Sequence, residues 1–152
     1  MRLLAIGRAP ARAPEMDICS RYAKRIKPGL ALVEFADGTG SPVEIKRREA
    51  EALLGAIKPD EFVIALDQDG AAPDSAALAQ LLAGWQERSR KLVFVIGGAE
   101  GLDASVLARA GAKISLGRLT WPHMLVRAML AEQIYRAQMI LAGHPYHRAG
   151  RP

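Results

Sequence analysis

The stretch LVFVIGGAEGL, residues 92–102, determines the fold class of this chain. Its first five residues are apolar, and most are β-branched or aromatic, which is typical of a strand buried on both faces. The pair Gly97-Gly98 ends that strand, because glycine adopts turn conformations that other residues avoid. A second run of this kind, FVIAL at residues 62–66, indicates another buried strand. The chain therefore contains a sheet that helices cover on both faces.

Strand-like runs alternate with helical patterns along the whole chain. This alternation predicts an α/β fold, with a mostly parallel sheet and helices on both faces. We find no repeat, low-complexity tract or linker, so residues 1–152 are expected to form one domain. Expected strands are Arg2–Ile6, Leu30–Phe35, Glu61–Leu66, Leu92–Ile96 and Ile114–Leu116; expected helices are Glu15–Lys27, Val43–Ile57, one capped by Asp74 or Ser75, a short one from about Asp103, and Met124 to about Leu141.

Two of these helices carry patterns that orient their faces. In the first, Ile18, Tyr22 and Ile26 recur at helical spacing and are expected to point inward. In the second, the charged side chains are expected to form a solvated face: Lys46, Arg47 and Arg48 with Glu44, Glu49 and Glu51.

Three loops follow strands and are candidates for ligand binding: Asp67–Pro73, Gly97–Leu102 and Gly117–His123. In parallel sheets, ligands bind beyond the carboxyl ends of the strands. The glycines at 97, 98 and 101 match neither a dinucleotide fingerprint nor a P-loop, which disfavours a phosphate cradle. A nucleoside pocket remains open, and so does a plain turn.

The loop GRLTWPH, residues 117–123, suits an adenosine pocket. It offers backbone donors and acceptors around apolar Leu119 and Trp121, the mixture found in small-molecule sites. The alternative is a long connection with a good helix start, in which Thr120 is the cap and Pro122 lies near the first turn.

Positive charge is concentrated in the C-terminal third of the sequence. Residues 104–152 hold seven Lys and Arg and one acidic residue, so they carry +6, whereas the whole chain carries +5. Such asymmetry favours a polyanionic partner, because each neutralised phosphate releases counterions. A basic surface kept for solubility is the alternative.

The tail HPYHR, residues 144–148, gathers His144, Tyr146, His147 and Arg148. Base recognition fits these side chains, since Tyr can stack, His can transfer a proton and Arg can bind an anion. A solvated terminus is the alternative. No metal is expected, because only His123 and Cys19 add nitrogen or sulfur ligands and a zinc site needs three or four.

Other features indicate a cytoplasmic protein. The single cysteine, Cys19, cannot form an internal disulfide and is expected to be a buried, inert thiol. No apolar run is long enough for a membrane span or a signal peptide.

The final helix is apolar over a wide arc, which suggests a partner helix across a two-fold axis. The alternative is a central helix buried on two sides within one chain. The arc consists of Leu125, Val126, Met129, Leu130, Ile134, Ala137, Ile140 and Leu141.

Taken together, IGGAEGL, SLGRLTWPHMLVR, EQIYRA and the terminal HPYHR resemble the ribosomal RNA large subunit methyltransferase H family, which belongs to the SPOUT class. The resemblance runs from LLAIGR to Arg148. It implies an α/β domain with a C-terminal trefoil knot, a rarity that general folding rules would have rejected. It also implies a homodimer in which one subunit's tail helps complete the other subunit's site.

The resemblance further implies the activity: methyl transfer from S-adenosylmethionine to N3 of a pseudouridine in 23S ribosomal RNA within the ribosome. The cofactor would contact Leu66, Gly98 and the run Gly117, Arg118, Leu119, Thr120, Trp121 and Pro122. His144, Tyr146, His147 and Arg148 would form the catalytic tail.

Two questions stay open at this point. The base that removes the N3 proton is His147, His144 or Glu100, in that order, and Arg148 would stabilise the anionic base. The rival class is a non-catalytic module that binds rRNA or the ribosome. The chain departs from the family at Trp121, where a smaller residue is usual, and at Met124.

Overall fold

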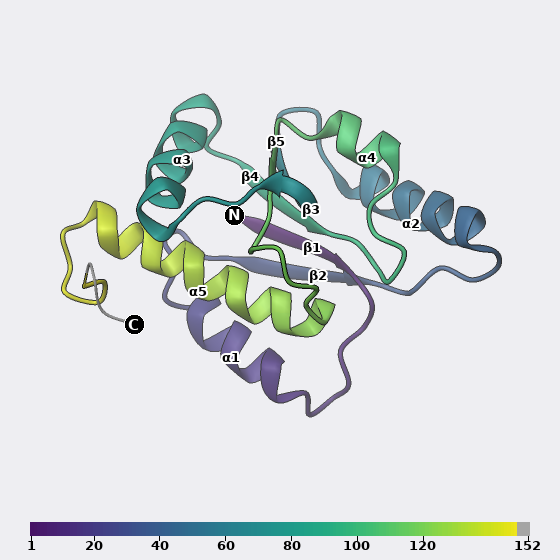
Figure 1. The fold of residues 1–152 in the computed structure, drawn as a ribbon, viewed down its shortest axis with the longest axis horizontal. Coiled ribbons are helices and arrows are strands. Elements are labelled where there is room, and N and C mark those ends of the chain that lie inside the picture. The colour runs from purple at the N-terminus through teal and green to yellow at the C-terminus, as the bar shows by residue number, and fades with distance from the viewer. Residues whose placement is uncertain (149–152) are drawn as a thin grey trace.

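In the computed structural model, which describes residues 1–148, the strands form one parallel sheet in the order β2-β1-β4-β3-β5 (Figure 1). The α/β fold expected from the sequence is confirmed. The strands are β1 (Arg2–Ile6), β2 (Ala31–Phe35), β3 (Phe62–Ala71), β4 (Leu92–Ile96) and β5 (Ala112–Ile114); the helices are α1 (Pro14–Ala23), α2 (Pro42–Ala56), α3 (Ser75–Arg88), α4 (Ala104–Arg109) and α5 (His123–Leu141).

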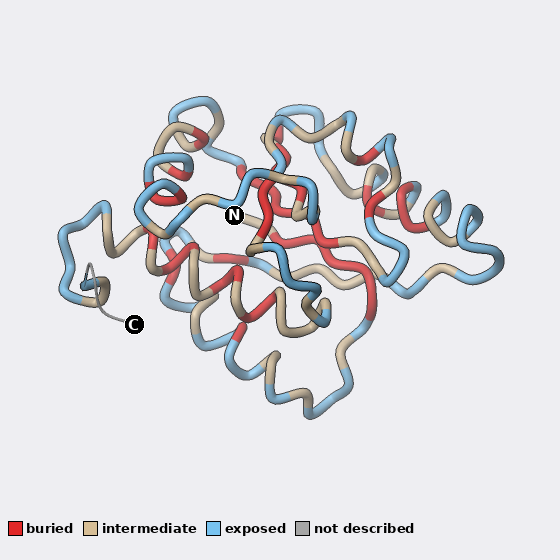
Figure 2. Tube along the Cα trace, viewed as in Figure 1, coloured by how far each residue is buried: buried red, intermediate tan, exposed pale blue. Residues whose placement is uncertain are grey.

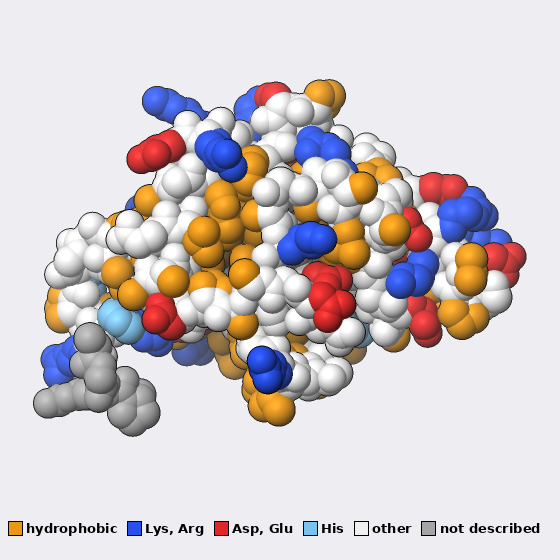
Figure 3. All heavy atoms as spheres, turned by 45° about the horizontal axis from the view of Figure 1, so that its top comes forward, with side chains coloured by type: hydrophobic (Ala, Val, Ile, Leu, Met, Phe, Trp, Pro, Cys, Tyr) orange, Lys and Arg blue, Asp and Glu red, His pale blue; other side chains and the backbone are white. Residues whose placement is uncertain are grey.

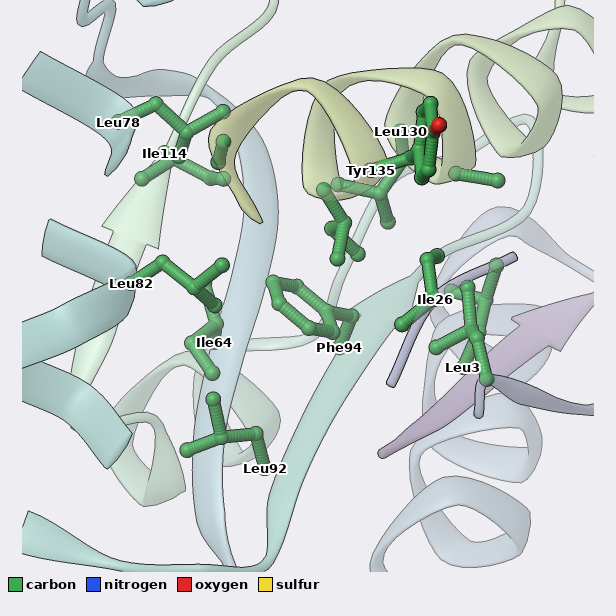
Figure 4. Packing of buried hydrophobic residues seen from close by; sticks show 14 of the residues in the cluster. Leu3, Ile26, Ile64, Leu78, Leu82, Leu92, Phe94, Ile114, Leu130 and Tyr135 are labelled. Atoms are coloured by element: carbon green, nitrogen blue, oxygen red, sulfur yellow. The ribbon is translucent and has the colours of Figure 1, made fainter. Parts of the chain in front are cut away.

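Helices cover both faces of this sheet, as predicted. On one face, side chains of α3 and α5 pack around Phe94 and Ile64 of the central strands (Figure 4). Cys19 of α1 belongs to the same cluster. On the other face, α2 and α4 contribute Leu53 and Val106 to a smaller apolar cluster. Buried positions therefore concentrate in the strands and on the inner sides of the helices (Figure 2).

Three helices begin at side-chain caps that the sequence supplies. Ser41 and Glu44 form a reciprocal capping box at α2, and the carboxylates of Asp74 and Asp103 accept backbone N–H groups at α3 and α4. The start of α5 differs from its prediction. Its N-cap is Pro122 without a side-chain hydrogen bond, so Thr120 is not the cap.

Strand β3 runs further than predicted, because residues 67–71 continue the strand instead of forming a loop. The pairing of β3 with β5 shifts register between Leu66 and Ala71, and Ala71 pairs with Ile114. Gly70 permits this crossing, since a Cβ at that position would lie 2.6 Å from the carbonyl carbon of Ile114. The single-sequence pattern carries no sign of a strand that resumes after an irregularity.

Smaller differences concern α1 and β5. Helix α1 ends at Ala23, because the chain must turn back to reach β2, and Ile18 is 40% exposed since Cys19 takes the inward position. Strand β5 covers residues 112–114, not the expected Ile114–Leu116, because Ile114 is already paired with the end of β3.

Helix α5 lies between α1 and α3 (Figure 1). Leu130, Ile134 and Ala137 are buried inside the chain, as in the alternative of a central helix, whereas Leu141 is 43% exposed. The homodimer therefore stays a prediction. The trefoil knot also stays one.

Arg127 fastens α5 to the ends of the neighbouring strands. Its side chain is fully buried and donates to Glu34 on β2 and to the carbonyl oxygens of Ile6 and Gly7, at 2.5, 2.6 and 2.7 Å. Burial lowers the pKa of the guanidinium, and the carboxylate of Glu34 acts in the opposite direction. The group remains charged at neutral pH because an arginine does not lose its proton in proteins.

Replacing this anchor should strongly destabilise the protein. Arg127→Ala would leave two buried carbonyl groups without this donor and Glu34 without its ion pair, so we expect a loss of about 3–5 kcal/mol in the free energy of unfolding. The matched control is Arg47→Ala, which removes an exposed i,i+4 pair with Glu51 and should change stability by less than about 1 kcal/mol. Urea denaturation followed by circular dichroism measures both. Equal losses would contradict the anchoring role.

Candidate active site

A cleft of about 660 Å³ lies at the carboxyl ends of β3, β4 and β5. The segments 66–69, 96–102 and 114–123 line it, which brings together parts of all three predicted ligand loops. Its volume is in the range of small-molecule sites. Ile96, Ile114 and Val126 supply apolar wall, and backbone groups of the loops supply polar contacts.

All residues predicted to contact a cofactor line this one cleft: Leu66, Gly98, Gly117, Arg118, Leu119, Thr120, Trp121 and Pro122. They lie on different walls, with Leu66 at the end of the buried part of β3 and Gly98 directly after β4. Gly117 has a φ of 109°, a conformation that favours glycine and turns the chain toward α5. The side chain of Leu119 is 71% exposed at the rim.

Trp121 brings an unpaired polar atom to the wall of the cleft. Its indole Nε1 is buried and has no hydrogen-bond partner among residues 1–148. A buried N–H without an acceptor is unfavourable, and a bound ligand with an acceptor group would relieve it. This donor therefore fits a cleft that takes a polar ligand.

Glu49 lies behind the glycine loop, contrary to its prediction as part of a solvated face. The residue is only 5% exposed, and its Oε1 accepts the backbone N–H of Gly38 at 3.0 Å. A Cβ at position 98 would lie 2.9 Å from both carboxylate oxygens of Glu49 and 3.0 Å from Ile6. Gly98 is thus required by packing against the fold. The charge pattern of α2 conceals this, because Glu49 directly follows the basic run Lys46–Arg48 and stands two residues before Glu51.

The predicted catalytic tail is docked against its own chain by Tyr146. The Tyr146 hydroxyl donates to Glu132 at 2.9 Å and lies 3.1 Å from the hydroxyl of Tyr22 on α1. Burial, followed by these hydrogen bonds, raises the pKa of Tyr146. Tyr146 therefore stays protonated at neutral pH and is a donor, not a base. The guanidinium of Arg136 lies over its ring, 5.0 Å from the centroid.

The other tail residues differ in their hydrogen bonding and in their exposure to solvent. The backbone N–H of Tyr146 donates to Nδ1 of His144, and His147 has a buried Nδ1 without a partner among the described residues. Arg148 is exposed. Sequence reasoning missed Glu132, which receives both Tyr146 and Arg136; its i,i+4 spacing from Arg136 was the available signal.

The cleft and the tail lie at opposite ends of α5. The helix begins beside the cleft, where Pro122 and His123 line the wall, and it ends at Leu141, just before the tail (Figure 1). Tyr146 returns along the helix to Glu132, but that residue is still nine positions from His123, about 14 Å at 1.5 Å per residue. One chain alone therefore does not bring the predicted cofactor and catalytic residues together.

The described part of the chain holds neither a metal-binding cluster nor a helix that could span a membrane. Among residues 1–148, no group of three or more His, Cys, Asp and Glu could hold a metal ion. No helix in that range has the length and hydropathy needed to cross a membrane.

Comparison with known proteins identifies the class. The family model described as a predicted SPOUT methyltransferase matches residues 1–147, and the chain belongs to this family. Similar relatives are called ribosomal RNA large subunit methyltransferase H. That of Acidiphilium cryptum is 60% identical over all of this chain and 96% of its own length. Those of Gluconacetobacter diazotrophicus and Rhodospirillum rubrum are 57% and 48% identical, over 100% and 98% of this chain and 99% and 100% of theirs.

A methyl group at position 98 tests the packing of the glycine loop. Gly98→Ala should lower the free energy of unfolding by about 1–3 kcal/mol, because its Cβ would collide with Glu49 and Ile6. Gly55→Ala on α2 is the matched control, since nothing lies within 4 Å of that Cβ and alanine favours a helix by about 1 kcal/mol. Thermal unfolding measures both. If the Gly98→Ala variant is as stable as the parent, the Glu49 side chain can move aside without a cost in stability, and packing does not require glycine at position 98.

Proposed function

We propose that this chain is an S-adenosylmethionine-dependent methyltransferase that modifies N3 of a pseudouridine in 23S ribosomal RNA. The observation that carries the proposal is the single cleft that unites the three loops, in a chain similar over its full length to large-subunit rRNA methyltransferases. Because the substrate is the ribosome, we place the protein in the cytoplasm.

The cleft suits the proposed cofactor. Its apolar walls can take the adenine ring, and loop backbone groups together with the unpaired Trp121 N–H can take polar groups. Leu66, Gly98 and residues 117–122 would hold the cofactor. When bound, S-adenosylmethionine supplies an electrophilic methyl group, so the residues of the chain need only orient the base and remove a proton.

The proton on N3 must leave before the nitrogen can attack. His147 is the first candidate base, because its Nδ1 is buried and not used by another residue of the described chain. His144 is second, since its Nδ1 already accepts a backbone N–H, and Glu100 at the cleft is third. Arg148, exposed beside His147, would stabilise the negative charge that develops on the base.

We propose a homodimer in which the tail of one subunit faces the cleft of the other. The length of α5 supports this arrangement, since Glu132, the residue that holds Tyr146, lies about 14 Å along the helix from His123, far beyond the roughly 3 Å that transfer requires. Helix α5 still has half-buried Met129 and Ile140 and exposed Leu141 available for such a contact.

The rival function is a module that binds rRNA or the ribosome without catalysis. Such a module has no use for a small-molecule cleft, which is what favours the enzyme. Calorimetry with S-adenosylmethionine separates the two classes, because the enzyme should bind this compound in the absence of RNA. Absence of binding, together with absence of methylation, would favour the rival.

The enzyme should discriminate pseudouridine from uridine. Pseudouridine has an additional N1–H, and a site that accepts this group leaves its acceptor unpaired with uridine, at a cost of about 1–3 kcal/mol or roughly ten- to a hundred-fold in rate. The measurement is methyl transfer to ribosomes from cells with and without the pseudouridine synthase for that position. Equal rates on the two preparations would refute the discrimination.

Mixing two inactive variants tests the shared site. Thr120→Trp places a large side chain in the rim of the cleft and should abolish cofactor binding, whereas Arg148→Ala should abolish turnover and leave cofactor binding intact. After subunit exchange, half the dimers contain one copy of each variant. Each of these dimers has one site made of an intact cleft and an intact tail, and one site with both defects, so about a quarter of the parent activity should return. Val43→Trp, at a position 78% exposed, is the control for the added bulk.

Tritium transfer to ribosomes measures this activity, and calorimetry verifies each variant's cofactor binding. If the tail acted within its own chain, the mixture would stay inactive. A parent that light scattering finds monomeric would also contradict the shared site.

A further inference from the structure

The end of α1 carries a basic cluster that the overall charge distribution conceals. Arg21, Lys24, Arg25 and Lys27 follow one another with no acidic residue between Ile18 and Ala31. All four are exposed. The N-terminal two thirds of the chain have a net charge near zero. The cluster is therefore found only when charge is counted over a short stretch of sequence.

The structure joins this cluster to the C-terminal half of α5. The backbone N–H of Lys27 donates to the side chain of Gln138 at 3.0 Å, and the amide of Gln138 donates back to the Lys27 carbonyl at 2.7 Å. The guanidinium of Arg25 lies over the ring of Tyr135, 5.2 Å from its centroid. The end of α1 is thus held against α5.

The tail completes the same surface. Tyr22 of α1 meets Tyr146 through their hydroxyl groups, and Tyr146 packs edge-on against Tyr135 at 4.9 Å. The carboxylate at these contacts, Glu132, is already engaged by Arg136 and Tyr146. We call the result the α1–tail surface, defined by Arg21, Arg25, Lys27, Arg136 and Arg148; Lys24 lies toward β2, where it lines a hollow with Ser20 and Leu32.

Its charge is largely uncompensated. Within residues 1–148, none of the four basic residues at the end of α1 forms an ion pair. By contrast, the face shown in Figure 3 has Lys and Arg interspersed with Asp and Glu. Cations near a helix C-terminus also stabilise the helix, but Lys27 lies four residues beyond the end of α1. Unpaired cations on one surface favour a polyanion.

We infer that the α1–tail surface binds the phosphate backbone of large-subunit rRNA beside the base that is methylated. The inference rests on the proposed function and assigns a substrate-binding role to α1, far from the basic stretch 104–152 along the sequence. Phosphate contacts fix the position and orientation of a nucleic acid, and here the contact of Tyr22 with Tyr146 joins the cluster to the tail that carries His147 and Arg148. The surface would therefore present the target nucleotide to the catalytic tail.

Neutralising two exposed residues tests this role. Arg21→Gln with Lys27→Gln removes two charges whose side chains make no hydrogen bond or ion pair within the described chain, so folding should persist. Arg88→Gln with Arg90→Gln is the matched control, because it removes two charges from the end of α3, on the other side of α5 from α1 (Figure 1). Lys27→Gln alone is a second variant, since only the backbone of Lys27 bonds Gln138.

Binding is measured with fluorescently labelled protein and ribosomes that lack the methyl group, over a series of salt concentrations. The double variant should bind about tenfold more weakly at low salt, and its slope of log K against log salt should fall by roughly one to two. The KM for ribosomes should rise, while kcat at saturation and the affinity for S-adenosylmethionine stay unchanged. The control should match the parent.

The inference is overturned if the double variant and the control bind ribosomes alike. It is also overturned if light scattering shows that the double variant has a different oligomeric state while its affinity for ribosomes is unchanged. The surface would then be an interface between protein chains. If the parent protein methylates rRNA and the double variant is unaffected, only this inference is wrong. If the parent protein does not methylate rRNA, the proposed function is wrong as well.

Discussion

The buried guanidinium of Arg127 is the interaction on which the arrangement of this molecule depends. Three acceptors from the ends of β1 and β2 hold it at 2.5–2.7 Å, so the first turns of α5 are fixed across the sheet. The segment 115–122 connects β5 to that fixed helix and therefore has to pass along the carboxyl edge of the sheet. The walls of the cleft follow from this constraint, together with Glu49, whose carboxylate lies behind the glycine loop.

The second constraint is the length of α5. A continuous helix of 19 residues is a rigid spacer, and it holds the tail at a fixed distance from the cleft of its own chain. Two copies related by a two-fold axis would place each tail beside the other copy's cleft without a change in either fold. In the proposed dimer, the reaction would then require both subunits. The contacts of Tyr146 with Tyr22, Tyr135 and Glu132 hold the tail in place within its own chain.

Much of the fold could be predicted from sequence, because strand and helix patterns are local. The runs at residues 92–96 and 62–66 fixed the sheet, Asp74 marked a helix start, and the residues expected to line a pocket do line one. The failures are non-local. Glu49 appears solvated until the loop at Gly98 packs on it, and the continuation of β3 depends on pairing with β5. The basic cluster on α1 becomes part of the same surface as the tail only through the contact of Tyr22 with Tyr146, which lies 124 residues away in the sequence.

The docking of Tyr146 has a consequence for the thermodynamics of substrate recognition. Ordering a flexible terminal segment removes about 1–2 kcal/mol of backbone entropy per residue at room temperature. Here the segment through Arg148 is anchored by hydrogen bonds and aromatic contacts before any RNA arrives, so that entropy is lost when the chain folds. Binding of the proposed rRNA substrate would then resemble the docking of two preformed surfaces more than folding upon binding, and the binding energy would be available for orienting the base.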